Sequence, residues 1–344
     1  MRTILIFKDF MSIFQREQSK HEQFSLRLSS LDSFVPLTKI CRAVAPVAAL
    51  FTVFGTVLGQ AAPSQANVPR SLLTPSLGAS EQITTAVAEA VNKVSGVEPK
   101  FCSHRLVSAI DEIIADPRFD TAQWGIVVEP IVEPTVLYQH NRDRALIPAS
   151  NTKLLTTAAA INLVSGRVPE IPVSLHQRLI EVNRHSNNRE ADALLHRMGG
   201  QNRVNQELMH LGLRPESYVQ VDGSGLSRSN RIPPSTLISL LKAMESHREG
   251  GVFYDSLPIA GVNGTLRNRF QNTRLHGKLH GKTGTLRGVR ALSGYLDNED
   301  YGTIAFSILV NQPGQSGQVL TRAIDQIVLQ TAQVNRCNSE SQKS

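Results

Sequence analysis

The sequence of 344 residues predicts an α+β fold, with one antiparallel sheet covered by helices and an inserted helical subdomain. Apolar or alternating segments typical of strands occur in two regions, 124–138 and 279–310. The stretch between them is rich in segments with helical spacing. An amphipathic helix is expected outside each strand region, at 106–114 and at 319–333. This order places both terminal helices against a sheet formed from the two ends of the domain.

Each element has its own local signal. The strands are expected at 124–128, 135–138, 279–285, 289–296 and 302–310, the first two forming a hairpin. The intervening helices are expected to begin near Ser150 and to span 175–184, 190–198, 204–211 and 234–246. Gly199 and Gly200 can end a helix, and Pro234 suits a first helical turn. The passage 257–269 is glycine-rich and irregular.

The first 100 residues have the character of a targeting region and a linker. Lys39 and Arg42 precede an apolar run at 43–58, and small residues follow at 59–66. We therefore interpret 1–66 as a leader with a signal peptide. The run is shorter than the ~20 residues of an ordinary membrane span, and an uncleaved anchor is the alternative. About 40 residues precede the run, so the true start site stays open.

The remaining boundaries follow from composition. Residues 67–100 are polar and contain prolines, so they are expected to form a linker. The hydrolase-like domain is expected at 101–337, followed by a polar tail at 338–344. A leader of this kind predicts export to the periplasm or cell envelope, with either secretion or membrane anchoring.

Composition and charge exclude some classes of protein. A hydrophobic content of 41% and a charged content of 19% are typical of a globular domain. The net charge of +7 comes from scattered residues, without a dense basic run and interleaved aromatics, so nucleic-acid binding has little support. A mildly basic surface is compatible with association with a membrane surface or an anionic polymer.

Two cysteines flank the expected domain. Cys41 lies in the leader, whereas Cys102 and Cys337 lie 235 positions apart in the mature part. An even pair in an exported protein favours a disulfide. Two free thiols are the alternative.

The segment from Pro148 to Ala160 predicts a helix that begins near Ser150. Lys153 lies three residues further on, so the serine hydroxyl and the lysine amine share one helix face. A serine becomes a nucleophile when a base is close, and a lysine with a lowered pKa can be that base. This pattern alone also fits a capping serine beside a surface lysine.

Two further motifs change that interpretation. Ser186-Asn187-Asn188 lies in an expected turn between helices, and Lys282-Thr283-Gly284 lies in an expected edge strand. With Ser150 and Lys153 they form the S-x-x-K, S-x-N and K-T-G set, which resembles that of serine penicillin-binding proteins and β-lactamases.

The set predicts a role for each member. Ser150 would attack a carbonyl and form an acyl-enzyme, with Lys153 as the base. Ser186 would relay a proton to the leaving amine under the influence of Lys282, and Asn188 would hold a substrate carbonyl. The backbone N–H groups of Ser150 and Thr285 would form the oxyanion hole.

The third motif is expected to bind substrate. Thr283, Gly284 and Thr285 continue the strand after Lys282, and an extended peptide can pair with such a strand. The hydroxyls of Thr283 and Thr285, with Lys282, would bind a C-terminal carboxylate.

Longer stretches at 222–231, 257–266 and 281–289 resemble the low-molecular-mass class C penicillin-binding proteins, over about residues 101–335. The resemblance implies a β-lactamase/transpeptidase-like fold and a serine-type D-Ala-D-Ala carboxypeptidase and endopeptidase of peptidoglycan. It implies a peptide ending in D-Ala-D-Ala as substrate, β-lactams as inhibitors that acylate Ser150, and no metal or organic cofactor.

One departure from the family pattern is large. Ser186 follows Ser150 by only 36 positions (150 to 186), where family members usually carry a long insertion of extra domains.

Several alternatives stay open. A serine β-lactamase shares the three motifs and would need a deacylating base, for which Glu190, Glu207, Glu216 and Glu245 are available. The missing insertion also allows a catalytically impaired peptidoglycan-binding homologue.

Other ionisable residues near the motifs have weaker functional signals. Arg287 and Arg290 either hold a substrate carboxylate or are solvated strand-end residues. His185 is expected to face solvent, and the spacing of His276 and His280 on a strand does not favour a zinc site.

Overall fold

The computed structural model describes residues 101–337. The expected leader, linker and polar tail, with Cys41, lie outside the described residues. Within them, no helix is both long and apolar enough to cross a membrane.

A five-stranded antiparallel sheet forms the centre of the domain, in the order β2-β1-β5-β4-β3. Its strands are β1 (Gln123–Pro130), β2 (Tyr138–His140), β3 (Leu279–Leu286), β4 (Val289–Asn298) and β5 (Gly302–Asn311). The two ends of the chain meet where β1 pairs with β5, with Val127 opposite Ser307. β3 is an edge strand that pairs with β4, with Lys282 opposite Ser293. The sheet and its flanking helices confirm the predicted fold class.

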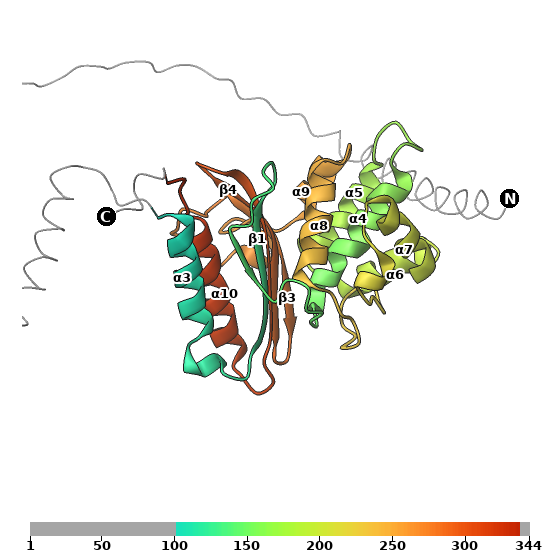
Figure 1. Cartoon of the computed structure of the whole chain (residues 1–344). Helices are drawn as coiled ribbons and strands as arrows, with labels where there is room; N and C mark the ends of the chain where they lie inside the picture. The colour runs from blue at the N-terminus through green and yellow to red at the C-terminus, as the bar shows by residue number, and fades with distance from the viewer. Residues whose placement is uncertain (1–100, 338–344) are drawn as a thin grey trace, which may run out of the picture. The chain divides into compact units, whose positions relative to one another are not determined.

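Helices cover both faces of the sheet (Figure 1). The terminal helices α3 (Ser103–Ile114) and α10 (Gly317–Thr331) lie together on one face. The helical subdomain covers the other face. Its members are α4 (Thr152–Val164), α5 (Val173–Asn183), α6 (Asn188–Arg197), α7 (Gln201–His210), α8 (Pro234–Glu245) and α9 (Gly250–Ser256).

Strand alternation divides the interior into two cores. Ile126 and Val128 of β1 pack with residues of α3 and α10, such as Ile110 and Ile324. Val127, between them, points into the other core, which holds the apolar residues of the helical subdomain. Each face of the sheet therefore buries one helical layer.

One local prediction was wrong, and one helix was missed. The second strand was expected at 135–138, but β2 spans Tyr138–His140 and pairs Tyr138 with Val128. The apolar run 135–137 lies in the connection before β2, so local composition misplaced the strand. The helix α9 was missed because it opens with Gly250 and Gly251, which are poor helix formers.

The short connection between α4 and α5 packs against the helical subdomain. Val168 and Ile171 in this connection are partly buried against the core of the helical subdomain. The Arg248 guanidinium donates a hydrogen bond to the Pro169 carbonyl at 2.9 Å. Deeper in, the side-chain amide of Asn183 donates to Thr157 at 3.1 Å and to Ser256 at 2.8 Å. These contacts join α4, α5 and α9 without any inserted domain.

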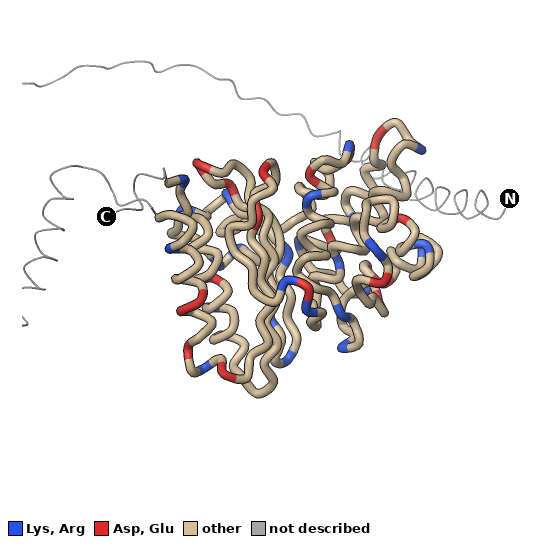
Figure 2. Tube along the Cα trace, in the orientation of Figure 1, with Lys and Arg blue, Asp and Glu red and all other residues tan. Residues whose placement is uncertain are grey.

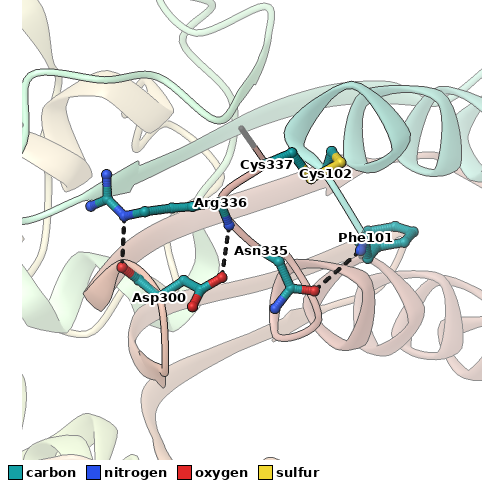
Figure 3. The surroundings of a disulfide bond; sticks show 6 residues. All are labelled: Phe101, Cys102, Asp300, Asn335, Arg336 and Cys337. Atoms are coloured by element: carbon teal, nitrogen blue, oxygen red, sulfur yellow. Dashed lines mark hydrogen bonds between the residues drawn. A yellow bond between two sulfur atoms is a disulfide. The ribbon is translucent and has the colours of Figure 1, made fainter. Parts of the chain in front are cut away.

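A disulfide between Cys102 and Cys337 joins the start and the end of the described chain, with Cα atoms 5.6 Å apart (Figure 3). Beside it, the Phe101 N–H donates to the Asn335 side chain at 3.1 Å. The Arg336 backbone N–H donates to the Asp300 carboxylate at 2.7 Å. The segment after α10 is thus fixed against the start of α3.

Charged residues are interspersed in sign along the described trace (Figure 2). The strands of the sheet carry few charged residues along this trace. The distribution agrees with a globular surface and not with a long basic stripe.

Candidate active site

Ser150 lies in a short 3₁₀ turn, Ala149–Asn151, that leads into α4. The preceding Ala149 has a φ of +48°, a left-handed conformation that non-glycine residues adopt rarely. The Ser150 hydroxyl does not cap the helix; it accepts a hydrogen bond from the Lys153 amine at 2.9 Å. The sequence expectation of a hydroxyl and an amine on one face is met in this geometry.

The Lys153 side chain is fully buried. Besides Ser150, its amine contacts Asn188 Oδ1 at 2.6 Å and the Ser224 carbonyl at 2.5 Å. Burial lowers the pKa of Lys153 to about 8, although the carboxylates of Asp192 and Asp222 act in the opposite direction. A neutral amine has two N–H donors and one lone pair. It can therefore donate to Asn188 and Ser224 while accepting the proton of Ser150.

The second motif forms the turn between α5 and α6. Ser186 has a φ of +56°, and the Asn187 side chain caps α6 by accepting from the Glu190 N–H at 3.1 Å. Asn188 is the first residue of α6 and directs its Oδ1 to Lys153. Because that oxygen is occupied by an amine, the Asn188 NH₂ group is the part that can donate to a ligand.

The third motif brings a second buried lysine to the site. Lys282 on β3 is fully buried, and its amine contacts the Ser186 hydroxyl at 2.9 Å and the Thr283 carbonyl at 3.0 Å. Burial lowers the pKa of Lys282 well below its usual value, and the neighbouring Lys153 amine lowers it further. The structure thus brings together the five residues expected to be catalytic: Ser150, Lys153, Ser186, Asn188 and Lys282.

Two glycines allow this close approach. A Cβ on Gly284 would lie 2.7 Å from the Pro148 carbonyl, so a side chain there would push β3 away from the Ser150 turn. A Cβ on Gly225 would overlap the Ala149 carbonyl, and Gly225 also has a φ of +82°. The loop that offers the Ser224 carbonyl to Lys153 therefore needs glycine at position 225, for its close approach to Ala149 and for its positive φ.

That loop is held by two carboxylates. Asp192 accepts from the N–H groups of Gly223 at 3.0 Å and Ser224 at 2.9 Å. Asp222 accepts from the Gly225 N–H at 2.6 Å and from the Ser227 N–H at 2.6 Å. These bonds fix the position of the carbonyl that contacts Lys153.

A cavity of about 410 Å³ opens beside the motifs. It is lined by Ser150, Ser186, Asn188, Thr265, Arg269, Thr283, Thr285 and Thr321. All the expected hydroxyl groups of the site therefore face one space.

Sequence reasoning missed three of these residues: Thr265, Arg269 and Thr321. They lie outside the three catalytic motifs, although Thr265 belongs to the 257–266 stretch noted above. The 264–278 segment and α10 bring them to the cavity. Thr265 accepts a hydrogen bond from the Thr283 hydroxyl at 2.7 Å, which connects the 264–278 segment to β3. The sequence around Arg269 and Thr321 holds no local signal for this site, because only the folded chain brings them to the cavity.

Arg287 and Arg290, for which a substrate carboxylate and a solvated strand end were alternatives, do not line the cavity. Arg287 is exposed, and the Arg290 guanidinium donates to the carbonyls of Leu286 and Val289, both at 2.8 Å. Arg269 is the arginine that lines the cavity.

The histidines near the motifs have separate surroundings. His185 is exposed, as expected, whereas His280 stacks on Tyr254 with ring centroids 4.0 Å apart. Within residues 101–337, no group of three His, Cys, Asp or Glu side chains is arranged to hold a metal ion.

Together, the fold and the three motifs around one cavity resemble those of penicillin-recognising serine enzymes. Known proteins agree with this classification. The sequence matches the D-Ala-D-Ala carboxypeptidase 3 (S13) family over residues 106–166 and 172–334, and the chain belongs to this family. The match is interrupted at 167–171, between α4 and α5.

Relatives share part of this sequence. The chain is 35% identical to penicillin-sensitive carboxypeptidase A of Dictyostelium discoideum over 182 residues, 47% of this chain and 34% of that protein. It is 35% identical to a D-alanyl-D-alanine carboxypeptidase of Actinomadura sp. over 175 residues, 46% of this chain and 32% of that protein. The chain thus spans about a third of the length of these relatives.

Solved structures share the fold. Penicillin-binding protein 4 of Haemophilus influenzae superposes with a TM-score of 0.57 at 14% identity, covering 65% of this chain and 99% of that one. A β-lactamase of Chitinophaga pinensis superposes with a TM-score of 0.55 at 16% identity, covering 65% and 97%. At these identities the likeness concerns the fold alone.

Proposed function

We propose that this protein is a serine-type D-Ala-D-Ala carboxypeptidase that also cleaves peptide cross-links of peptidoglycan, through an acyl-enzyme on Ser150. The contact between the Lys153 amine and the Ser150 hydroxyl at 2.9 Å, with the pKa of Lys153 lowered to about 8, carries the proposal. Near neutral pH part of the enzyme then holds a neutral amine beside the hydroxyl, which is the state that a general base requires.

The chemistry follows from the contacts. Lys153 takes the hydroxyl proton of Ser150 while Oγ attacks the carbonyl carbon of the penultimate D-Ala. The backbone N–H groups of Ser150 and Thr285 stabilise the oxyanion. Ser186 passes a proton to the departing amine of the last D-Ala, and Lys282, 2.9 Å away, supports that transfer. Water then hydrolyses the acyl-enzyme and restores the hydroxyl.

The free edge of β3 supports peptide binding beside Thr283 and Thr285. The first half of the strand is already covered, because the Gly281 N–H donates to the Pro258 carbonyl at 3.0 Å. The half that carries Thr283 and Thr285 borders the cavity instead. An extended stem peptide can add to this half as a further strand, with Asn188 donating to its backbone.

A β-lactamase is the second candidate, and the site gives it less support. Rapid deacylation needs a base at the acyl-enzyme, yet none of the described residues that line the cavity is a carboxylate. Glu190 pairs with Arg178 and Arg197, and Glu207 pairs with Arg203. A penicillin is therefore expected to acylate Ser150, and the resulting acyl-enzyme is expected to hydrolyse slowly.

A disulfide and the expected leader support export, and we propose that the protein works in the cell envelope on peptidoglycan. Membrane-surface association is a part of this proposal that rests on the net charge of +7 alone.

The proposal is tested by incubating the purified protein with a pentapeptide ending in D-Ala-D-Ala, and separately with a penicillin. The wild type should release D-Ala, whereas Ser150→Ala should release none. Ser246→Ala, a serine exposed at the end of α8, should behave as the wild type. Turnover of penicillin without release of D-Ala would establish a β-lactamase, and a folded protein with neither activity would identify an impaired homologue.

A further inference from the structure

Arg269 contributes the formal charge to the wall of the active-site cavity. The other described residues that line it carry hydroxyl or amide groups: Ser150, Ser186, Asn188, Thr265, Thr283, Thr285 and Thr321. Lys153 and Lys282 lie behind this wall and are fully buried. A ligand in the cavity therefore meets neutral donors along one side and a guanidinium at Arg269.

The guanidinium is held in place by a carboxylate from α10. Arg269 Nε donates to Asp325 Oδ1 at 3.0 Å, and Nη2 contacts the same oxygen. The Arg269 and Asp325 side chains retain only 18% and 24% of their exposure. A guanidinium has five N–H donors, so Asp325 occupies part of the group and leaves the rest for an anion.

The backbone beside Arg269 is constrained in the same way as at the motifs. Among the described residues, four non-glycine residues have a positive φ: Asn141, Ala149, Ser186 and Phe270. Ala149 precedes Ser150, Ser186 lines the cavity itself, and Phe270 follows Arg269. Unfavourable conformations of this kind persist only where the surroundings enforce them, and they cluster at functional sites.

We propose that Arg269, oriented by Asp325, binds the free C-terminal carboxylate of the substrate. Arginine binds carboxylates through paired hydrogen bonds, and the release of a terminal D-Ala calls for a group that binds its free carboxylate. The Thr265 hydroxyl accepts from Thr283 and keeps its own hydrogen, so it adds a neutral donor for that carboxylate. Arg269 is then the specificity-determining residue, and Asp325 is a positioning residue. The inference rests on the proposed function.

A purely structural ion pair that holds the 264–278 segment against α10 would have the same contacts. The structural role and the carboxylate-binding role differ in substrate dependence, because loss of a structural ion pair affects every substrate equally. The comparison needs two ligands that differ only at the end: diacetylated L-Lys-D-Ala-D-Ala and its C-terminal amide.

Kinetics test the discrimination. Arg269→Gln should lower kcat/KM for the acid about 10- to 100-fold, mainly by raising KM. It should change kcat/KM for the amide by less than about twofold. Arg269→Lys should recover part of the loss. Asp325→Asn should raise KM for the acid with a smaller effect on kcat. The matched control is Arg118→Gln, which removes an exposed pair with Asp116 and should change neither substrate.

Binding separates this inference from the proposed function. In a Ser150→Ala background, calorimetry should show the acid binding about 10- to 100-fold more tightly than the amide, and Arg269→Gln should remove the difference. Equal losses for acid and amide, or no loss for either, would overturn the role of Arg269. Tight acid binding by a protein without peptidase activity would overturn the proposed function and leave the carboxylate site intact.

Discussion

The two faces of the sheet bury interiors of different kinds. The α3–α10 side is packed with apolar residues such as Leu106, Phe306 and Ile327, and its ends are tied by the Cys102–Cys337 disulfide. The side covered by α4 to α9 buries polar groups next to its apolar core, among them Lys153 and Asn183. Buried polar groups are costly unless they are paired.

The difference separates stability from chemistry. The α3–α10 side has no functional residue other than Thr321 and the Arg269–Asp325 pair at its edge, among the residues that the structure describes. The helical side holds Ser150, Lys153, Ser186 and Asn188, with their supporting hydrogen bonds. We therefore expect substitutions on the helical side to affect activity first, and those at the disulfide to affect stability first.

The largest expected effect is that of Lys153→Met. The variant loses the base, so the rate of acylation by penicillin should fall about 10²- to 10⁴-fold. Removing a buried amine also removes its desolvation cost, so the melting temperature should stay within about 4 °C of the wild type. Stopped-flow acylation and thermal unfolding measure the two quantities. A variant that is acylated at the normal rate would show that Lys153 is not the base.

Removing the disulfide tests the other face. The double substitution Cys102→Ser, Cys337→Ser should lower the free energy of unfolding by about 2–5 kcal/mol in urea titrations. The acylation rate of the folded fraction at 25 °C should stay within about twofold of the wild type. Reductant should destabilise the wild type and leave the variant unchanged. A slowed acylation in the folded variant would contradict the separation of the two faces.

Asn183→Ala tests how the short α4–α5 connection is supported. The variant loses the hydrogen bonds to Thr157 and Ser256 and should be destabilised by about 1–3 kcal/mol. Asn202→Ala, in an exposed position of α7, is the matched control and should be nearly neutral. Equal stabilities of the two variants would mean that Asn183 does not hold the shortened subdomain together.

The smallest expected effect is a change in pH dependence. For the wild type, acylation should rise with pH and level off above about 8, because the neutral form of Lys153 is the reactive one. Asp192→Asn removes a charge that raises the pKa of Lys153, while the amide oxygen can still accept from Gly223 and Ser224. The rising limb should therefore move to lower pH. A shift to higher pH in rate-against-pH profiles would contradict the assigned electrostatics.

The same lysine affects stability with a definite sign. Its pKa is about 8 in the folded protein and 10.5 as a free side chain, so the unfolded state binds more protons between these values. This group therefore contributes stability that increases as the pH rises from about 8 to 10.5.

The motifs made the centre of the site predictable from sequence. Ser150 and Lys153 follow from helical spacing, and Lys282 follows from a strand that could be identified locally. Arg269 and Thr321 could not be predicted, because only the folded path of 264–278 and of α10 brings them to Ser150. The errors at β2 and α9 have the same origin, since strand pairing and the burial of Phe253 outweighed local propensity.

The central claim is that Ser150 is an activated nucleophile in this compact domain. Mass spectrometry after incubation with a penicillin tests it most directly, by locating the added mass on a proteolytic peptide. We predict one equivalent of adduct on the peptide that contains Ser150, and none in Ser150→Ala. An adduct on another residue, or no adduct on folded wild-type protein, would contradict the account.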